Sequence, residues 1–500
     1  MPVPQHILEV ERPKNSVVIV YGKNKNLYAV RQRVGCKNVN GRHVPINGPT
    51  IGHIVDGKYI PLDEFRKSKK NCTKFPSVKN DSNITASNNG IGVDLKDWAN
   101  IHFCKTVSES VLEELRQVYP WDDALKLFCI AILRVCYPGI KDYQLKEYYD
   151  NSFLSEIYPA VGLSKNTVSK FIKDRGRNCS RIFTFMQNRA KSIKMNHHIL
   201  IDGTLKTNDS KINSLSNFSR KAKLKGRKDI SVIYAFDLEA MEPICSKCYP
   251  GNMLDVTAYE DFISTNNITR GVIVADKGFP SSMAEQYYSK NPDLHYLNPI
   301  KRNSKFITTH DLYNYTDVHS VYSTVTYCKA KCSGLNKWLY SFRDAKQAAI
   351  EEQEWIARAK EKGEFSASAL RENQLKFGTI ILECNLDLDP EQVYRIYSER
   401  WEIEIVMRYY KTACEFDDTR VHDDYSVIGS EFIDFLATLC TWKMIKKFDS
   451  CKLLEEMNYK NIMSILQRAK KIKLPMIDSW NLIKINPSQL KILERLGLLI

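Results

Sequence analysis

The sequence predicts an α/β protein built from several domains. Two short apolar runs, HILI at 198–201 and GVIVA at 271–275, have the length of buried strands, and each is followed directly by an aspartate. A third segment, 390–416, has apolar residues at helical spacing and contains no glycine and no second proline. Since a single core stops growing near ~250–300 residues, we expect the 500 residues to form three or four compact units.

The chain is strongly basic, with 73 Lys and Arg against 58 Asp and Glu and a formal net charge of +15. Such an excess predicts a polyanionic partner, either nucleic acid or an anionic membrane surface, and charge alone does not choose between them. No apolar run reaches the ~20 residues of a membrane span. The first residues also lack the apolar centre of a signal peptide. We therefore expect a soluble cytoplasmic protein.

Fourteen cysteines are scattered along the chain. In a cytoplasmic protein they indicate reduced, mostly buried thiols rather than a disulfide framework. The pairs Cys245–Cys248 and Cys328–Cys332 could together supply four thiolates to a zinc ion. The first pair lies in strand-like sequence, however, and the second has three intervening residues, so buried thiols are the better interpretation.

Residues 1–65 are expected to form a β-rich module, because runs of β-branched and aromatic residues alternate with turn residues. Three segments predict turns between strands: Asn40-Gly41, Asn47-Gly48-Pro49 and Asp56-Gly57. Residues 66–105 begin with a polar, basic stretch that has no apolar periodicity. We expect this second segment to be a linker.

Residues 106–190 are expected to be helical, since their apolar residues recur at helical spacing. Within them, LSEIYPAVGLSKNTVSKFIKDRG resembles a helix-turn-helix, with Gly162 at the turn and Ser164 as the N-cap of the second helix. That helix would present Lys165 and Lys170 to DNA. Paired short helices also occur without DNA, but the basic charge of the chain favours a contact.

Residues 191–306 are expected to form the first part of a core. The strand at 198–201 ends at Asp202, which places a carboxylate where an open sheet can hold a metal, although such an aspartate can also simply form a turn. The loop at 206–228 carries eight Lys and Arg against one Asp. Its candidate contacts to a phosphate backbone include Lys221, Lys223, Lys225 and Arg227. A solvated loop is an equally good interpretation of this composition.

The remaining elements complete the core. Two strands about a turn at 237–240, a helix in TAYEDFISTNN and the strand before Asp276 follow one another along the chain. Strand, hairpin, helix and strand is the element order of an RNase H-like core. Over 307–376 the pattern changes to further strands and a charged helix, residues 377–450 return to the core, and 451–500 are expected to be a helical tail.

The helix expected at 390–416 begins after Asp389, a plausible N-cap, with proline at its first position. At about 100° per residue, four polar side chains fall within roughly 60° of one another on one stripe. They are Tyr397, Arg400, Glu404 and Lys411. Apolar residues on the adjoining face would hold this stripe against a core. Ordinary surface pairing at helical spacing is the simpler alternative.

The spacing Tyr-x2-Arg-x3-Glu-x6-Lys in YSERWEIEIVMRYYK resembles the YREK signature of bacterial transposases of the insertion-sequence-four type, and all four positions match. The similarity spans roughly 195–445. It implies a DDE transposase with an RNase H-like catalytic core interrupted by a β-rich insertion. It also implies that Asp202, Asp276 and Glu404 are the catalytic carboxylates and hold Mg²⁺ or Mn²⁺, with two ions at the site.

The resemblance further implies a reaction and its partners. Water would cleave DNA at the ends of an insertion sequence, and the freed 3′-hydroxyl would attack target DNA. Tyr397, Arg400 and Lys411 would contact that DNA. The expected partners are the terminal inverted repeats and the target duplex, bound by a homodimer associated with the nucleoid.

Two other functions stay open at this stage. A structure-specific nuclease or resolvase could use the same core to cut DNA without joining ends. A DNA-binding regulator could keep the fold without catalysis, although three intact carboxylates argue against it.

Overall fold

The computed structural model describes residues 3–20, 27–39, 42–55, 57–62, 64, 93–208, 210–219, 226–253, 255–275, 288–398, 419, 421–475 and 477–499. Contacts divide the chain into two compact units, Met1–Gly92 and Val93–Ile500. Among the described residues, none of the helices is both long enough and apolar enough to cross a membrane.

The first unit contains a four-stranded antiparallel sheet in the order β1-β2-β3-β4. The elements are α1 (Gln5–Leu8), β1 (Ser16–Val20), β2 (Leu27–Val39), β3 (Arg42–Val55) and β4 (Lys58–Pro61). Val39 pairs with Arg42, and Val55 pairs with Lys58. These pairs confirm hairpins at the first and third predicted turns, and Gly57 at the third has a φ of +76°.

The predicted turn at Asn47-Gly48-Pro49 is wrong, because these residues lie inside β3. Arg31 pairs with Thr50 and Arg33 with Asn47, so two residues of β3 oppose one residue of β2. This is a β-bulge, one of the few places where a sheet accommodates proline. Turn composition alone does not separate a bulge from a hairpin.

The second unit begins with β5 (Asp94–Asp97) and a set of helices. These are α3 (Ala99–Val107), α4 (Glu109–Arg116), α5 (Trp121–Cys136), α6 (Leu145–Asp150), α7 (Leu154–Ile157), α8 (Lys165–Arg177) and α9 (Ser180–Ala190). The segment expected to be a linker therefore overlaps β5 and most of α3. Strand β5 pairs with β15 (Lys470–Lys473), a partner that no local pattern could indicate.

A nine-stranded mixed sheet forms the centre of the second unit, in the order β11-β12-β13-β14-β10-β9-β6-β7-β8. Its core strands are β6 (His198–Thr207), β7 (Asp229–Asp237), β8 (Glu242–Pro250), β9 (Gly271–Ala275), β10 (Leu294–Pro299) and β14 (Thr379–Cys384). β9 is parallel to both β6 and β10, and the other pairs are antiparallel. These elements confirm the strands predicted from the apolar runs. α10 (Asp255–Thr265) confirms the predicted helix between β8 and β9.

The block at 307–376 extends this sheet rather than forming a separate one. It contains β11 (Asp317–Val318), β12 (Val325–Lys331), β13 (Trp338–Asp344), α13 (Ala345–Glu361) and α14 (Ala367–Gln374), and α12 (Lys305–Thr309) leads into it. β13 pairs with β14 along six residue pairs, which joins the block directly to the core.

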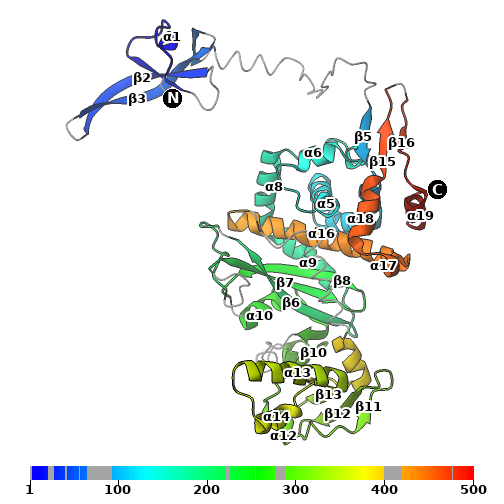
Figure 1. The fold of residues 1–500 in the computed structure, drawn as a ribbon. Coiled ribbons are helices and arrows are strands. Elements are labelled where there is room, and N and C mark those ends of the chain that lie inside the picture. The colour runs from blue at the N-terminus through cyan, green and yellow to red at the C-terminus, as the bar shows by residue number, and fades with distance from the viewer. Residues whose placement is uncertain are drawn as a thin grey trace. The chain divides into compact units, whose positions relative to one another are not determined.

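The helix α16 (Asp424–Ser450) is the main cover of β6–β8, and Figure 1 shows α10 on the opposite face of these strands. Asp423 caps it by accepting a hydrogen bond from the Ser426 amide at 3.2 Å. α8 crosses α16 so closely that a Cβ on Gly176 would lie 1.8 Å from the Tyr425 carbonyl oxygen. A Cβ on Gly429 would lie 2.1 Å from the Ile172 carbonyl oxygen.

A buried charge network joins β6, α5 and α16. Lys206 Nζ lies 2.5 Å from a Glu431 oxygen and 3.0 Å from an Asp434 oxygen. Arg134 lies 2.6 Å from the other Asp434 oxygen and 3.1 Å from Asp142. Burial opposes the charge of Lys206, but Asp434 and Glu431 outweigh it, so the pKa of Lys206 lies well above its ordinary value.

The C-terminal residues are not only helical. α17 (Leu453–Glu456), α18 (Tyr459–Arg468) and α19 (Pro487–Arg495) are present, but β15 and β16 (Trp480–Leu482) lie between them and form a three-stranded sheet with β5. Leu466 and Leu493 are fully buried. The tail is therefore part of the second unit's core, and the expectation of an all-helical tail is corrected.

We predict that Gly176→Ala destabilises the second unit by ~1–3 kcal/mol, because the added methyl group meets the backbone of α16 rather than a side chain that can move. The measurement is thermal or urea unfolding. Gly162→Ala is the matched control, since its Cβ would meet no atom closer than 3.7 Å. Equal stability of the two variants would contradict the close helix contact.

We also predict that Lys206→Met destabilises the protein by ~3–5 kcal/mol, because it leaves buried carboxylates without one of their cations. Urea unfolding measures this, with exposed Lys211→Met as the control. Burial raises the pKa of Glu431 and Lys206 lowers it, so Lys206→Met raises this pKa further, and the folded variant binds a proton that the unfolded state does not bind just above the ordinary carboxyl range. The loss should therefore shrink as pH falls toward that range, whereas a loss independent of pH would contradict this account.

Candidate active site

Asp202 lies within β6, opposite Tyr234 of β7. The strand does not end at Asp202, as the apolar run predicted, but continues to Thr207 because β7 pairs with it throughout. β9 pairs with β6 in parallel, and the last described pair is Ile201 opposite Ala275. Asp202 is half-buried, and its Oδ1 accepts a hydrogen bond from the Gly203 amide at 2.8 Å.

The residue after Ala275 in the sequence is Asp276, which lies outside the described residues. In the described register Ile201 pairs with Ala275, so Asp202 and Asp276 each follow directly, in the sequence, a member of the same parallel pair. Adjacent strands in a sheet are about 4.8 Å apart. Asp202 on β6 and Ala275 at the described end of β9 therefore lie on neighbouring strands.

The beginning of the predicted helix is present as a helical segment at 390–398. Asp389 accepts a hydrogen bond from the Gln392 amide at 3.0 Å, which confirms it as the N-cap. Tyr397 is buried, with 4% of its surface exposed. Arg400, Glu404 and Lys411, which complete the predicted stripe, lie outside the described residues.

The chain beyond this helix is tied to the end of β6. The Thr419 amide donates to the Thr207 carbonyl oxygen at 3.0 Å. Asn208 Nδ2 donates to the carbonyl oxygens of Thr419 and Val421 at 3.0 and 3.1 Å. Thr419 Oγ1 donates to buried Glu431 at 2.9 Å. The strand that carries Asp202 thus also holds the chain that follows residue 418.

Besides the stripe of the predicted helix, the predicted DNA contacts fall into two groups. On α8, Lys165 and Lys170 are exposed, and Ser164 is at the N-cap position, as the helix-turn-helix pattern predicted. The preceding helix α7 has only four residues, so the motif is shorter than expected. In the basic loop, Arg227 is exposed, whereas Lys221, Lys223 and Lys225 lie outside the described residues.

The prediction that Lys206 belongs to the basic loop is wrong. Sequence composition grouped it with the loop cations, but it belongs to β6 and is only 3% exposed. Its charge is engaged by Glu431 and Asp434 and is unavailable to a phosphate. Its pairing partners are more than 200 residues away, so no local signal could have identified them.

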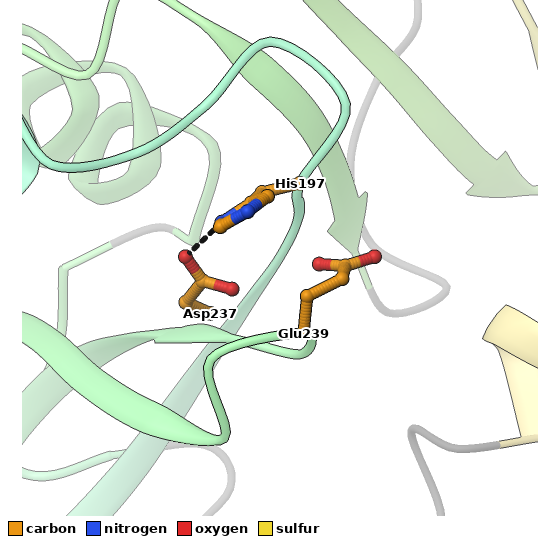
Figure 2. A group of neighbouring side chains, drawn as sticks. All are labelled: His197, Asp237 and Glu239. Carbon is orange, nitrogen blue, oxygen red and sulfur yellow. Dashed lines mark hydrogen bonds and ion pairs between the residues drawn. The ribbon is translucent and has the colours of Figure 1, made fainter.

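A second group of ligand-type side chains was not recognised in the sequence: His197, Asp237 and Glu239 (Figure 2). One ligand atom from each lies within 4.8 Å of the others. His197 Nδ1 is 2.5 Å from Asp237 Oδ2, and the His198 amide donates to Glu239 at 2.7 Å. Burial alone would raise the pKa of Glu239, but contacts with His198 outweigh burial and lower this pKa.

The group of His197, Asp237 and Glu239 is separate from Asp202. Ile199 pairs with Asp237, whereas Asp202 pairs with Tyr234, so the two positions differ by three residues along the strands, or about 10 Å. Its hydrogen bonds close the turn between β7 and β8. Asp237 Oδ1 also accepts from the Ala240 amide at 2.8 Å, as expected for a turn aspartate.

The four-cysteine zinc alternative is excluded by the sheet order. Cys245 and Cys248 lie on β8, and Cys328 lies on β12 at the other side of the sheet. Six strands lie between β8 and β12, so seven strand spacings separate them, which corresponds to about 34 Å. All twelve cysteines among the described residues are free.

One comparison supports the coarser part of the sequence resemblance, a DDE transposase. Residues 194–427 match the family model described as Transposase DDE domain. No curated protein matches the chain. A piggyBac transposase, solved by cryo-EM in a synaptic complex with hairpin DNA, is similar with a TM-score of 0.39 and 12% identity, over 74% of this chain and 79% of that chain. That likeness is too distant to define the fold. The family match covers β6 with Asp202 and the helix start at 390–398, and it supports a DDE transposase.

Proposed function

We propose that this protein is a transposase of the insertion-sequence-four type that cleaves DNA at the ends of an insertion sequence and transfers the freed strand into target DNA. The observation that carries the proposal is the register of β6 and β9, in which Ile201 and Ala275, the residues before Asp202 and Asp276, pair with each other within the segment that matches the family model. The YREK spacing after the Asp389 cap is the second support.

The strand arrangement supports an RNase H-like core. β6, the β7–β8 hairpin, α10 and β9 follow one another in the expected order, and β9 returns beside β6 in parallel. In an open sheet of this kind, ligands bind outside the carboxyl ends of parallel strands. Asp202 directly follows Ile201, the last described residue of β6 that pairs with β9.

In this proposal, Asp202, Asp276 and Glu404 hold two Mg²⁺ or Mn²⁺ ions. The donor set fits, because three carboxylates supply the oxygen ligands that hard cations prefer, and the described member, Asp202, is half-buried rather than enclosed in the core. When bound, the ions would activate the attacking oxygen and stabilise the leaving one. The carboxylates orient that chemistry, while Arg400 and Lys411 hold the neighbouring phosphates.

DNA binding would use positive surfaces outside this centre. Lys165 and Lys170 project from the exposed side of α8, whose other side is buried through Val168 and Ile172. The loop cations Lys221, Lys223, Lys225 and Arg227 would add phosphate contacts. The proposed partners are the terminal inverted repeats and target DNA on the nucleoid, bound by a homodimer. Tyr397 would support the site mainly through its buried ring.

The central test is Glu404→Gln, which keeps the size of the side chain and removes its charge. We expect cleavage of a duplex carrying the DNA that flanks the coding region to fall by a factor of ~10² or more with Mg²⁺, because stabilisation of the transition state is lost. DNA affinity should change little. Asp202→Asn should behave in the same way.

Glu239→Gln is the control for that experiment, since its carboxylate belongs to the same sheet but to the separate group near His197. It should cleave at close to the wild-type rate. Wild-type cleavage by folded Glu404→Gln would reject Glu404 as a catalytic carboxylate and with it the proposed function. No cleavage by the folded wild type would leave a DNA-binding regulator. Cleavage by the wild type without strand transfer would instead indicate a nuclease or resolvase.

A separate prediction concerns binding. Replacing Lys165 and Lys170 together by alanine should weaken DNA binding and reduce the slope of log affinity against log salt by about 1.8, because each phosphate contact contributes ~0.9. The measurement is affinity between 50 and 200 mM salt. The exposed Lys362→Ala is the control. An unchanged slope in the double variant would exclude α8 from the DNA interface.

A further inference from the structure

The block at 307–376 forms hydrogen bonds with the chain that leads into the helix at 390–398. The Leu388 amide donates to Tyr340 Oη at 2.7 Å, and this hydroxyl donates to the Leu386 carbonyl oxygen at 3.1 Å. Lys329 donates to the Leu388 carbonyl oxygen at 2.8 Å and pairs with Asp387. Two strands of the block, β12 and β13, therefore set the path by which the chain enters this helix.

A second contact is made with the first turn of the helix itself. The Ser320 amide donates to Glu391 Oε1 at 2.8 Å, and Ser320 Oγ donates to the other carboxylate oxygen. These hydrogen bonds lower the pKa of Glu391. His319 Nδ1 accepts from the amides of Val321 and Tyr322, so its Nε2 carries the proton and donates to the Glu391 carbonyl oxygen at 3.3 Å.

Aromatic packing fixes the next turn. The ring of Tyr394 lies 5.5 Å from His319, 5.5 Å from Tyr322 and 5.2 Å from Phe342, measured between ring centroids. Tyr394 follows Glu391 by three residues, so both occupy the same side of the helix. Polar and aromatic contacts thus define both the tilt of the helix and its rotation about its axis.

We propose that Ser320 and Glu391 are positioning residues. They would set the orientation of the helix that is predicted to carry Glu404, an inference that rests on the proposed function. On the predicted helix, Glu404 lies about 20 Å beyond Glu391 at 1.5 Å per residue. A tilt of about 3° at the start would displace Glu404 by about 1 Å. A misplacement of that size at a reacting centre can reduce the rate by ~10².

The contact is well placed for such a role because it adds little to stability. The Glu391 side chain is 29% exposed, and contacts of exposed carboxylates add little to stability because water competes for the same oxygens. Loss of this contact should therefore leave the fold intact. The consequence would appear in the rate of the chemical step, which depends on a few ångströms at the far end of the helix.

The test compares Glu391→Ala, Glu391→Gln and Ser320→Ala in the full-length protein. Single-turnover cleavage of the flanking-DNA duplex with Mg²⁺ gives the rate constant, a binding titration gives the affinity, and thermal unfolding gives the melting temperature. We expect Glu391→Ala to lower the rate constant 10- to 100-fold without changing affinity or melting temperature. Glu391→Gln should recover much of that rate, because its amide oxygen still accepts from the Ser320 amide. Ser320→Ala, which keeps that amide, should lie between them.

Glu352→Ala, a partly exposed carboxylate on α13, is the matched control and should cleave normally. A wild-type rate for Glu391→Ala alongside inactive Glu404→Gln would overturn the positioning role alone. A rate loss matched by lower affinity or a lower melting temperature would also overturn it. Wild-type cleavage by Glu404→Gln would instead reject the proposed function, so the two failures are distinguishable.

Discussion

The buried charges around Lys206 constrain the second unit more than any other interaction. Taking an ion out of water costs several kcal/mol, and that cost is offset only when every partner is in place. Lys206 belongs to the sheet, Arg134 to the helical region, and Glu431 and Asp434 to α16. The sheet and both helical layers must therefore assemble together, because partial assembly would leave a charge buried without compensation.

This constraint reaches the candidate active site through the backbone. Lys206 follows Asp202 by four residues on the same strand, so the two side chains share one face of the sheet. Glu431 also accepts a hydrogen bond from Thr419, whose amide is bonded to Thr207. The end of β6 is thus a common anchor for a proposed metal ligand and for the chain that follows the proposed catalytic helix.

The other end of that helix has its own anchor in the block at 307–376. Because β13 pairs with β14 and β14 pairs with β10, the block is continuous with the sheet that carries Asp202. Hydrogen-bonded strands of one sheet hold one another in fixed relative positions, since their register is fixed pair by pair. An insertion of this kind can therefore act as a rigid support for the helix start rather than as an appended surface module.

Local physics in the sequence determined the apolar runs of β6 and β9, the cap at Asp389 and two of the three predicted turns, because apolar runs, capping residues and glycine act over a few residues. Tertiary structure decided what depends on distant partners. The sequence alone placed Lys206 in the basic loop, but in the structure Glu431 and Asp434 enclose it. The sequence alone also placed β5 in the linker, but in the structure it pairs with β15. A buried charge or a lone strand is stable only beside its partner, and no local pattern specifies where that partner lies.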